Sequence, residues 1–169
     1  MKANKSTPPP VIDSARVIVH ATVDKSVVYT GNLHLLVGGK RLGKVPKLAI
    51  CKNMAGGRKD FLILFCNDKW QSRGVVSTAT LKEAKQAAES YYAGISKRFV
   101  KMDVSERAAR RWLEEKYPDL MCSFCGRLYF EFESAVSSKK ATVCGDCIRA
   151  FAQQLESIET DAGRRRTGK

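Results

Sequence analysis

The sequence predicts an α+β fold, in which a small domain of antiparallel strands and helices precedes a four-cysteine module with a C-terminal helix. Short β-branched runs separated by glycine pairs occupy much of the first 66 of the 169 residues. Apolar residues then recur at helical spacing, and four of the six cysteines form two Cys-x-x-Cys pairs. These changes divide the chain into residues 1–14, 15–118, 119–160 and 161–169.

The first domain is expected to begin with strands after a disordered tail at residues 1–14. The prolines in Thr7-Pro8-Pro9-Pro10 lack backbone donors and suit neither a helix nor a sheet ladder. Gly38-Gly39 is typical of a hairpin turn, and residues 53–60 contain a second glycine pair that predicts another turn. β-Branched or apolar runs predict strands at residues 16–24, 32–37, 47–51 and 61–66.

Two helices are expected after the strands. Thr80 is a candidate N-cap, and Glu83 three residues later completes a capping-box pattern before apolar residues at helical spacing. Gly94 is a stop signal for this helix. A second helix is expected over residues 104–116, with Ser105 or Asp103 as its N-cap. Pro118 closes both this helix and the domain.

The chemistry-bearing motif is a set of four cysteines with eighteen residues between the two pairs. Zn²⁺ in structural sites prefers four tetrahedral ligands, and thiolate is a common choice. Four protein ligands leave no open position for water, so the pattern predicts scaffolding and excludes hydrolytic zinc chemistry at this site. The alternatives are a pair of thioredoxin-like redox motifs or free cysteines in the core. The expected ligands of one structural Zn²⁺ are Cys122, Cys125, Cys144 and Cys147.

The segment between the two pairs predicts a β-hairpin. Strand-like stretches flank a Ser-Ser-Lys-Lys turn at residues 137–140, which would return the second pair to the first. Gly126 follows Cys125 directly and suits a knuckle that needs a positive φ. A helix would then run on from Cys147. This order predicts a module similar to a treble clef or zinc ribbon.

Residues 121–152 resemble the N-terminal zinc-binding domain of the ClpX ATPases. The resemblance rests on Cys-Ser-Phe-Cys-Gly at the first knuckle, on Val-Cys-Gly-Asp-Cys-Ile at the second, and on the helix that follows. It implies zinc binding by the four cysteines, dimerisation, and binding of substrate or adaptor proteins. No G-x-x-x-x-G-K-[ST] sequence is present, so the chain is not expected to be an ATPase. The interface residues implied by the resemblance are Phe124, Tyr129, Phe130, Ile148 and Phe151.

The net charge of +13 is concentrated before the cysteine module. Residues 1–120 hold 22 Lys and Arg against 11 Asp and Glu, whereas residues 121–169 hold 8 against 6. Such a basic surface attracts nucleic acid or an acidic protein, and the sequence leaves both partners open. Candidate polyanion-binding residues are Lys40, Arg41, Lys44, Arg58, Lys59, Arg110 and Arg111.

The remaining reactive residues have simpler structural interpretations. His20 and His34 lie in strand-like runs, where imidazoles more often pack than bind metal. Cys51 and Cys66 lack knuckle partners and are expected to be buried thiols. An enzymatic alternative would need one of these histidines to meet one of these thiols in a pocket.

The sequence therefore predicts a non-enzymatic protein-interaction protein with one structural zinc ion. Its cysteine module would dimerise or dock a protein partner. The alternative is an accessory protein that binds nucleic acid through the basic domain. No export signal or bilayer-spanning run is visible, so a cytoplasmic location without membrane contact is expected.

Overall fold

The computed structural model describes residues 7–55 and 60–167, with side chains described through residue 159. The chain divides into two compact units, unit 1 (Met1–Leu113) and unit 2 (Glu114–Lys169). Unit 1 holds an antiparallel sheet with helices, and unit 2 holds the four cysteines and a helix. The predicted α+β class is thus confirmed. The boundary between the units falls a few residues before the predicted joint at Pro118.

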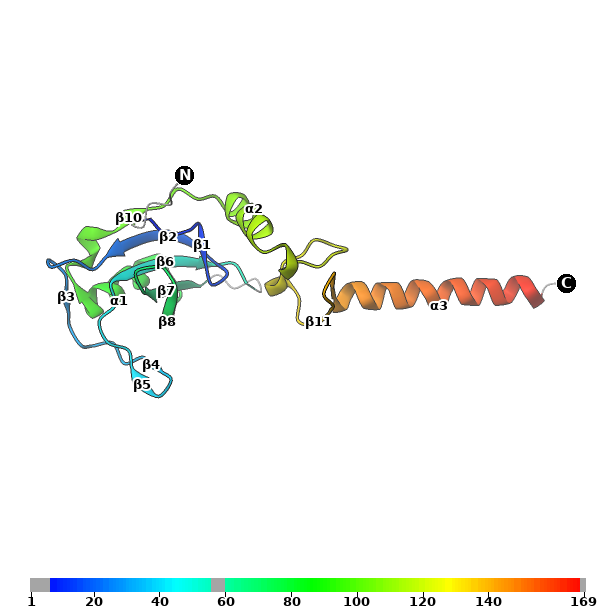
Figure 1. Cartoon of the computed structure of the whole chain (residues 1–169), viewed down its shortest axis with the longest axis horizontal. Helices are drawn as coiled ribbons and strands as arrows, with labels where there is room; N and C mark the ends of the chain where they lie inside the picture. Colours follow the sequence, from blue (N-terminus) through cyan, green and yellow to red (C-terminus); the bar gives the residue numbers. More distant parts are fainter. Residues whose placement is uncertain (1–6, 56–59, 168–169) are drawn as a thin grey trace. The chain divides into compact units, whose positions relative to one another are not determined.

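Unit 1 is built around a six-stranded antiparallel sheet whose main strands lie side by side in Figure 1. Three of the predicted strands, at residues 16–24, 47–51 and 61–66, are its longest or most buried members. The strand order is β1-β2-β6-β7-β8. Strand β10 pairs with the C-terminal part of β2, whereas β1 pairs with its N-terminal part. The strands are β1 (Val11–Ile12), β2 (Ala15–Thr22), β6 (Lys47–Asn53), β7 (Phe61–Cys66), β8 (Ser72–Thr78) and β10 (Val100–Lys101).

The N-terminal segment is a strand where a disordered tail was expected. Val11 and Ile12 are buried and pair with β2, and the backbone N–H of Val17 donates to Pro10 O at 3.0 Å. Asp13 and Ser14 both have positive φ, as a tight two-residue hairpin turn requires. The prolines thus end before the strand begins. The expected tail is wrong for residues 11–14, and residues 1–6 lie outside the described residues.

The Gly38-Gly39 hairpin is present, but its first strand is shorter than expected. Only β4 (Leu36–Val37) pairs with β5 (Lys40–Arg41), around two glycines with positive φ. In the segment before β4, the Arg41 guanidinium donates to the carbonyls of Gly31 and Leu33. These carbonyls are satisfied by a side chain, and Leu33 is buried in the core.

Strand β8 was not predicted, because its sequence shows little apolar alternation. It completes the sheet beside β7, with register from Phe61↔Thr78 to Cys66↔Ser72. Gly74 on β8 lies directly under Leu35, where an added Cβ would come within 2.4 Å of the Leu35 side chain. Residue 74 is therefore a glycine because another part of the chain approaches it closely, and local patterns cannot predict such a contact.

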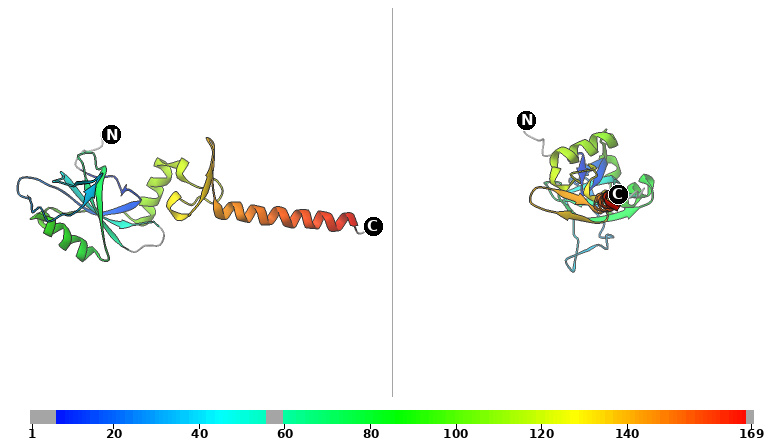
Figure 2. Two further views of the ribbon diagram at one scale, coloured as in Figure 1. Left: turned by 90° about the horizontal axis from the view of Figure 1, so that it is seen from below. Right: turned by 90° about the vertical axis from the view of Figure 1, so that its right-hand side faces the viewer.

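Helix α1 (Leu81–Tyr91) covers one face of the sheet in Figures 1 and 2 and begins at the predicted cap. Thr80 Oγ1 accepts from the backbone N–H of Glu83 at 3.1 Å, and the Glu83 carboxylate accepts from the N–H of Ala79. Ala84 and Ala88 bury the helix against the larger core cluster. After the helix, β9 (Tyr92–Ala93) pairs with β3 (Val28–Tyr29), and η1 (Ile95–Arg98) begins after Gly94.

Helix α2 (Glu106–Lys116) also follows the predicted start and stop signals. Ser105 Oγ accepts from the backbone N–H of Ala108 at 3.1 Å, which caps the helix. The short η2 (Pro118–Leu120) follows.

Two apolar clusters share the sheet of unit 1. The larger cluster includes Ile50, Phe65 and Tyr92, and the smaller one includes Cys51, Cys66 and Trp70. The two clusters alternate along β6 and β7, as residues on opposite faces of a sheet do.

In unit 2, the hairpin of β11 (Ala135–Ser137) and β12 (Thr142–Cys144) leads into α3 (Gly145–Thr167). The short η3 (Tyr129–Glu131) replaces the first strand-like stretch expected before this hairpin. Helix α3 continues through Thr167, so the disordered tail expected at residues 161–169 is wrong up to that residue, and 168–169 lie outside the described residues. No helix in the described part of the chain is long and apolar enough to cross a membrane.

Candidate metal centre

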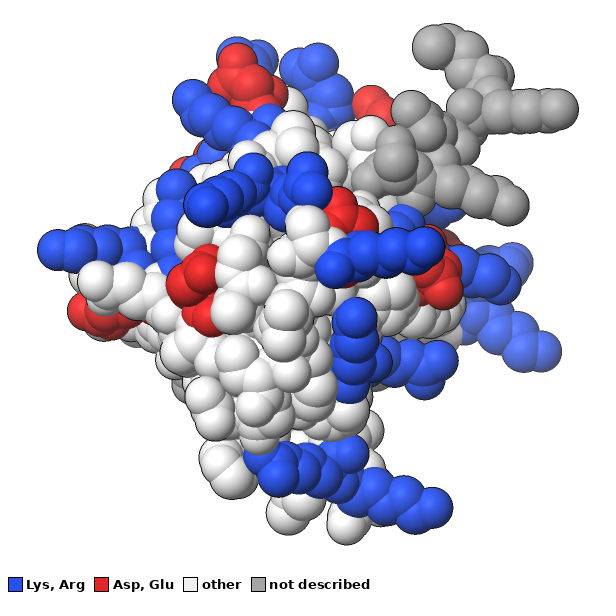
Figure 3. Space-filling model, turned by 90° about the vertical axis from the view of Figure 1, so that its left-hand side faces the viewer, with Lys and Arg blue, Asp and Glu red and all other residues white. Residues whose placement is uncertain are grey.

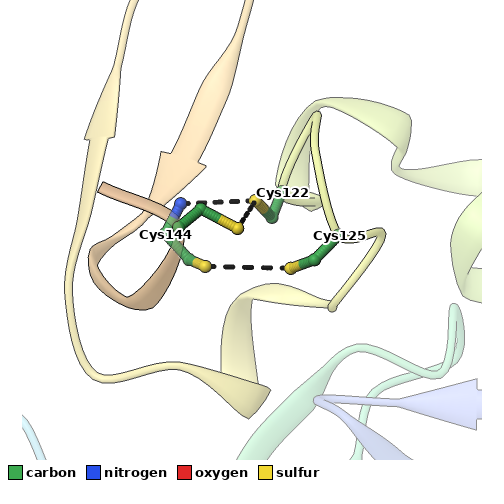
Figure 4. A group of neighbouring side chains, drawn as sticks. Cys122, Cys125 and Cys144 are labelled. Carbon is green, nitrogen blue, oxygen red and sulfur yellow. Dashed lines mark hydrogen bonds between the residues drawn. The ribbon is translucent and has the colours of Figure 1, made fainter. Parts of the chain in front are cut away.

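The four predicted ligands come together at one point in unit 2. Their sulfur atoms all lie within 4.8 Å of one another. The Sγ atoms of Cys122 and Cys147 are 3.8 Å apart, and those of Cys125 and Cys144 are also 3.8 Å apart. Figure 4 shows the side chains of Cys122, Cys125 and Cys144 pointing toward one another from two separate segments.

The two distances of 3.8 Å match those expected around a tetrahedral metal ion. A Zn–S bond of about 2.3 Å in a regular tetrahedron places two sulfurs about 3.8 Å apart. Four soft thiolates match zinc better than a hard cation such as Mg²⁺ or Ca²⁺, which prefer oxygen ligands. The four cysteines therefore form a site that can bind a metal ion such as zinc.

The first pair sits on a tight knuckle. The backbone N–H of Gly126 donates to Cys122 O at 2.9 Å, and the N–H of Cys122 donates to Arg127 O at 2.8 Å. Gly126 has a φ of 70°, the left-handed conformation that its position after the second cysteine predicts. Leu128 then closes the knuckle by bridging to Met121 and is buried.

The second pair joins the hairpin to the helix. Cys144 ends β12, and Cys147 lies in the first turn of α3. The backbone N–H of Cys144 donates to Cys122 Sγ at 3.4 Å, and the N–H of Gly145 donates to Ser134 O at 2.8 Å. The predicted hairpin thus returns the second pair to the first.

Arg127 lies against the sulfur cluster and supplies positive charge there. Its Nε is 3.4 Å from Cys125 Sγ and its Nη2 is 3.2 Å from Cys144 Sγ. The same guanidinium forms an ion pair with Asp146 at 2.6 Å, and Asp146 also pairs with Arg149. Such outer contacts orient thiolate ligands and offset their charge.

The surroundings of the cysteines favour thiolates at two of the four positions in the metal-free cluster. Hydrogen bonds from the backbone N–H groups of Cys125 and Cys144 lower the pKa of Cys122 to about 6. The Arg127 guanidinium lowers the pKa of Cys125. Desolvation and the neighbouring thiols raise the pKa of Cys147 to about 12. A bound divalent cation would also favour the thiolate of Cys147, because the cation stabilises all four thiolates together.

The predicted interface residues lie on the surface of unit 2. Phe124 is 64% exposed and packs edge-to-face on Phe151, with ring centroids 4.6 Å apart. Tyr129 and Phe130 form a second edge-to-face pair at 5.2 Å. Ile148 is exposed on α3.

The sequence prediction missed two exposed apolar residues on α3, Leu155 and Ile158. They follow Ile148 and Phe151 at helical spacing, and this spacing was the signal that would have identified them. Val136 on β11 is a further exposed apolar residue of unit 2.

The described candidate polyanion-binding residues lie on two elements. Lys40, Arg41 and Lys44 are exposed at or just after the β4–β5 hairpin, whereas Arg110 and Arg111 lie on α2. Arg41 also has the structural role at Gly31 and Leu33. Arg58 and Lys59 lie outside the described residues.

The charge of the chain is divided between the two units. Unit 1 holds 21 Lys and Arg against 8 Asp and Glu, and unit 2 holds 9 against 9. The net charge of +13 is therefore that of unit 1 alone. Figure 3 shows one face on which Lys and Arg clearly outnumber Asp and Glu.

The other reactive residues of unit 1 are packed or exposed singly. His20 is buried against Trp70. Burial, and to a smaller extent the positive charge of Lys47, lowers the pKa of His20. His34 is exposed. Burial raises the pKa of Cys66 to about 12 and that of Cys51 well above its usual range, so both stay protonated thiols at neutral pH.

No protein-family model matches the chain, and comparisons with curated proteins and with solved structures also find no match. The resemblance of residues 121–152 to the ClpX zinc-binding domain accordingly rests on the motif residues alone.

Proposed function

We propose that the chain is a non-enzymatic protein-interaction protein whose unit 2 is folded by one structural zinc ion. The observation that carries this proposal is the near absence of an apolar core in unit 2. Among its side chains described through residue 159, only Cys122, Leu128 and Cys144 are buried. Two of these three are candidate ligands. A module with so small a core needs a metal to fold.

The geometry supports a structural role for this zinc. Four cysteine ligands would fill the coordination sphere of a zinc ion, so no position would be left for substrate or water. The exposed apolar residues around the centre support the interaction role. Phe124 and Phe151 pair across the first knuckle and the helix, so the metal would fix the surface that they form.

Zinc binding, and the dependence of unit 2 on zinc for folding, are tested with the purified full chain. We expect about one zinc per chain by elemental analysis, and Cys144→Ser or a strong chelator should abolish hydrogen-exchange protection in unit 2 while unit 1 keeps its protection. Cys66→Ser is the matched control, because it changes a buried thiol of unit 1 and should leave the zinc content unchanged. Retention of full protection in unit 2 after metal removal would contradict the structural role.

The interaction role is tested by affinity capture from nuclease-treated lysate. Wild-type protein should retain a specific set of proteins that both Cys144→Ser and Phe124→Ser lose. The control is Val136→Ser, which removes an equally exposed apolar residue on β11. Identical captured sets for wild type, Cys144→Ser and Phe124→Ser would rule the interaction role out.

A second candidate function is nucleic-acid binding by unit 1. The observation that favours it is the confinement of the whole net charge of +13 to that unit. Phosphate backbones attract such surfaces without base-specific contacts.

A further inference from the structure

The β4–β5 hairpin projects from the rest of unit 1 and ends in a bare apolar tip (Figure 1). The hairpin tip consists of Leu36, Val37, Gly38 and Gly39, of which Leu36 is 69% exposed and Val37 44% exposed. A Cβ added at either glycine would meet no atom within 4 Å. The two apolar side chains are therefore free to enter a partner.

The base of the hairpin is held firmly, in contrast to its tip. The Arg41 guanidinium donates to two carbonyls of the preceding segment, and the backbone N–H of Leu42 donates to Leu35 O at 2.7 Å. The Tyr29 hydroxyl donates to Leu42 O at 3.2 Å. Leu35 and Leu42 pack against the larger apolar cluster. A ribbon fixed in this way loses little conformational freedom when its tip is bound.

The sequence around the hairpin tip is basic throughout. Residues 25–59 contain eight Lys and Arg and no Asp or Glu. Lys40 and Lys44 are exposed next to the tip, and neither has an ion pair within the described residues. Their charge is complementary to that of the phosphates that line both sides of a nucleic-acid groove.

The chemistry of the hairpin tip selects one way of binding a duplex. The side chains of Leu36 and Val37 have no hydrogen-bond donors or acceptors, so they cannot read the hydrogen-bonding pattern of base edges. Apolar side chains of this kind act instead as wedges, which enter the minor groove and partly unstack one base step.

A bilayer suits the hairpin tip less well than a duplex does. Even a single myristoyl chain binds a membrane only marginally, and Leu36 and Val37 together have less apolar surface than such a chain.

We propose that the hairpin tip inserts into the minor groove of duplex DNA, with Leu36 as a wedge between base pairs and Lys40 and Lys44 on the flanking phosphates. This proposal rests on the candidate nucleic-acid binding by unit 1, to which it gives a site and a substrate class. Insertion kinks the duplex, so a duplex with a mismatch, which unstacks at lower cost, should bind more tightly than a fully paired one.

The test uses the purified full chain and a short DNA duplex with a fluorophore at each end, so that energy transfer reports bending. Wild type should bind the duplex and bring its ends closer. Leu36→Gln/Val37→Gln should raise the dissociation constant at least about 10-fold and abolish bending, because it removes the apolar wedge. The salt slope should keep its wild-type value, since no phosphate contact is lost. Leu36→Met, which stays apolar, should still bend the duplex.

The matched control is Val75→Gln/Val100→Gln, which changes two comparably exposed apolar residues on β8 and β10. It should bind and bend DNA like wild type. Denaturant melts check that each variant is folded.

Two results would overturn the inference and leave nucleic-acid binding by unit 1 intact. One is a wild type that binds the duplex without bending it, and the other is a tip variant that binds and bends like wild type. Failure of wild type to bind any probe at low salt would remove both proposals. Vesicles that contain phosphatidylserine form a second arm, and loss of vesicle binding by a tip variant that still bends DNA would assign the tip to a membrane instead.

Discussion

At the scale of single residues, Arg127 is a charged side chain in direct contact with the candidate metal centre. Its guanidinium contacts the sulfurs of Cys125 and Cys144 and is ion-paired with Asp146. A zinc ion with four thiolates carries a formal charge of −2, and Arg127 offsets part of it within hydrogen-bond distance. Arg127 is therefore a positioning residue for two ligands on different segments.

Replacing Arg127 should loosen the metal without removing a ligand. We expect Arg127→Gln to speed zinc transfer to a chromophoric chelator about 10-fold, because outer contacts typically change metal affinity by about 10- to 100-fold. Arg149→Gln is the control, since Arg149 reaches only Asp146 in the described contacts and should change the rate less than about twofold. Equal transfer rates in the two variants would show that the contacts between Arg127 and the sulfurs do not help to retain zinc.

At the scale of elements, Glu89 ties the end of α1 to the segment that follows. Its carboxylate accepts hydrogen bonds from the backbone N–H groups of Gly94 at 2.6 Å and Ser96 at 2.8 Å. These hydrogen bonds lower the pKa of Glu89 below its ordinary value of 4.5, and the bond from Gly94 has the largest effect. Gly94 has a φ of 87°, so this turn depends on a glycine as well as on the carboxylate.

The Glu89 bonds should give unit 1 a pH-dependent contribution to stability. A lowered pKa in the folded state means that the contribution is present above the unfolded-state pKa and is lost as pH falls through the folded-state pKa. Glu89→Gln should therefore lower the free energy of unfolding by about 1 kcal/mol at neutral pH, and by less below pH of about 4. Denaturant melts at both pH values measure this difference.

Glu115→Gln on α2 is the control for that comparison, because Glu115 is exposed and no comparable bonds to backbone are described for it. Its effect should be small at both pH values. A destabilisation by Glu89→Gln that persists unchanged in acid would refute the contribution of the carboxylate charge.

At the scale of the whole molecule, the two units differ in how they are stabilised and in charge. Unit 1 has two apolar clusters and the entire net charge, whereas unit 2 has almost no buried side chains and is neutral. The proposed zinc would supply the stabilisation that the small core of unit 2 lacks. The proposed polyanion binding would use the excess positive charge of unit 1.

Nucleic-acid binding by unit 1 should depend steeply on salt. Binding of a labelled single- or double-stranded probe should weaken strongly between about 50 and 200 mM salt, as released counterions require. Lys40→Glu/Lys44→Glu should weaken binding and reduce the salt slope by about 2, at roughly one per lost phosphate contact. Arg41 is left unchanged, because it holds the Gly31–Leu33 segment in place.

The matched control is Lys139→Glu/Lys140→Glu, which changes the charge of unit 2 by the same amount at the exposed hairpin turn. It should bind the probe like wild type. No binding to any probe at low salt would remove this candidate function.

The features determined by the sequence alone are those with local causes. The Thr80 and Ser105 caps, the Gly38-Gly39 turn and the apolar strand β7 each depend on a few neighbouring residues, and all were predicted. The metal site was also predictable, because Cys-x-x-Cys spacing places two sulfurs on one turn and a hairpin returns the second pair.

Only the tertiary structure decided the features that depend on residues far apart in the chain. Strand β8 pairs with β7 and has Leu35 close to Gly74, β1 pairs with β2, and Arg41 binds the carbonyls of Gly31 and Leu33 where a strand was expected. Periodicity cannot predict such contacts, because it describes one segment at a time. The small core of unit 2 and the exposure of the apolar residues on α3 have the same origin, since burial is a property of the folded chain.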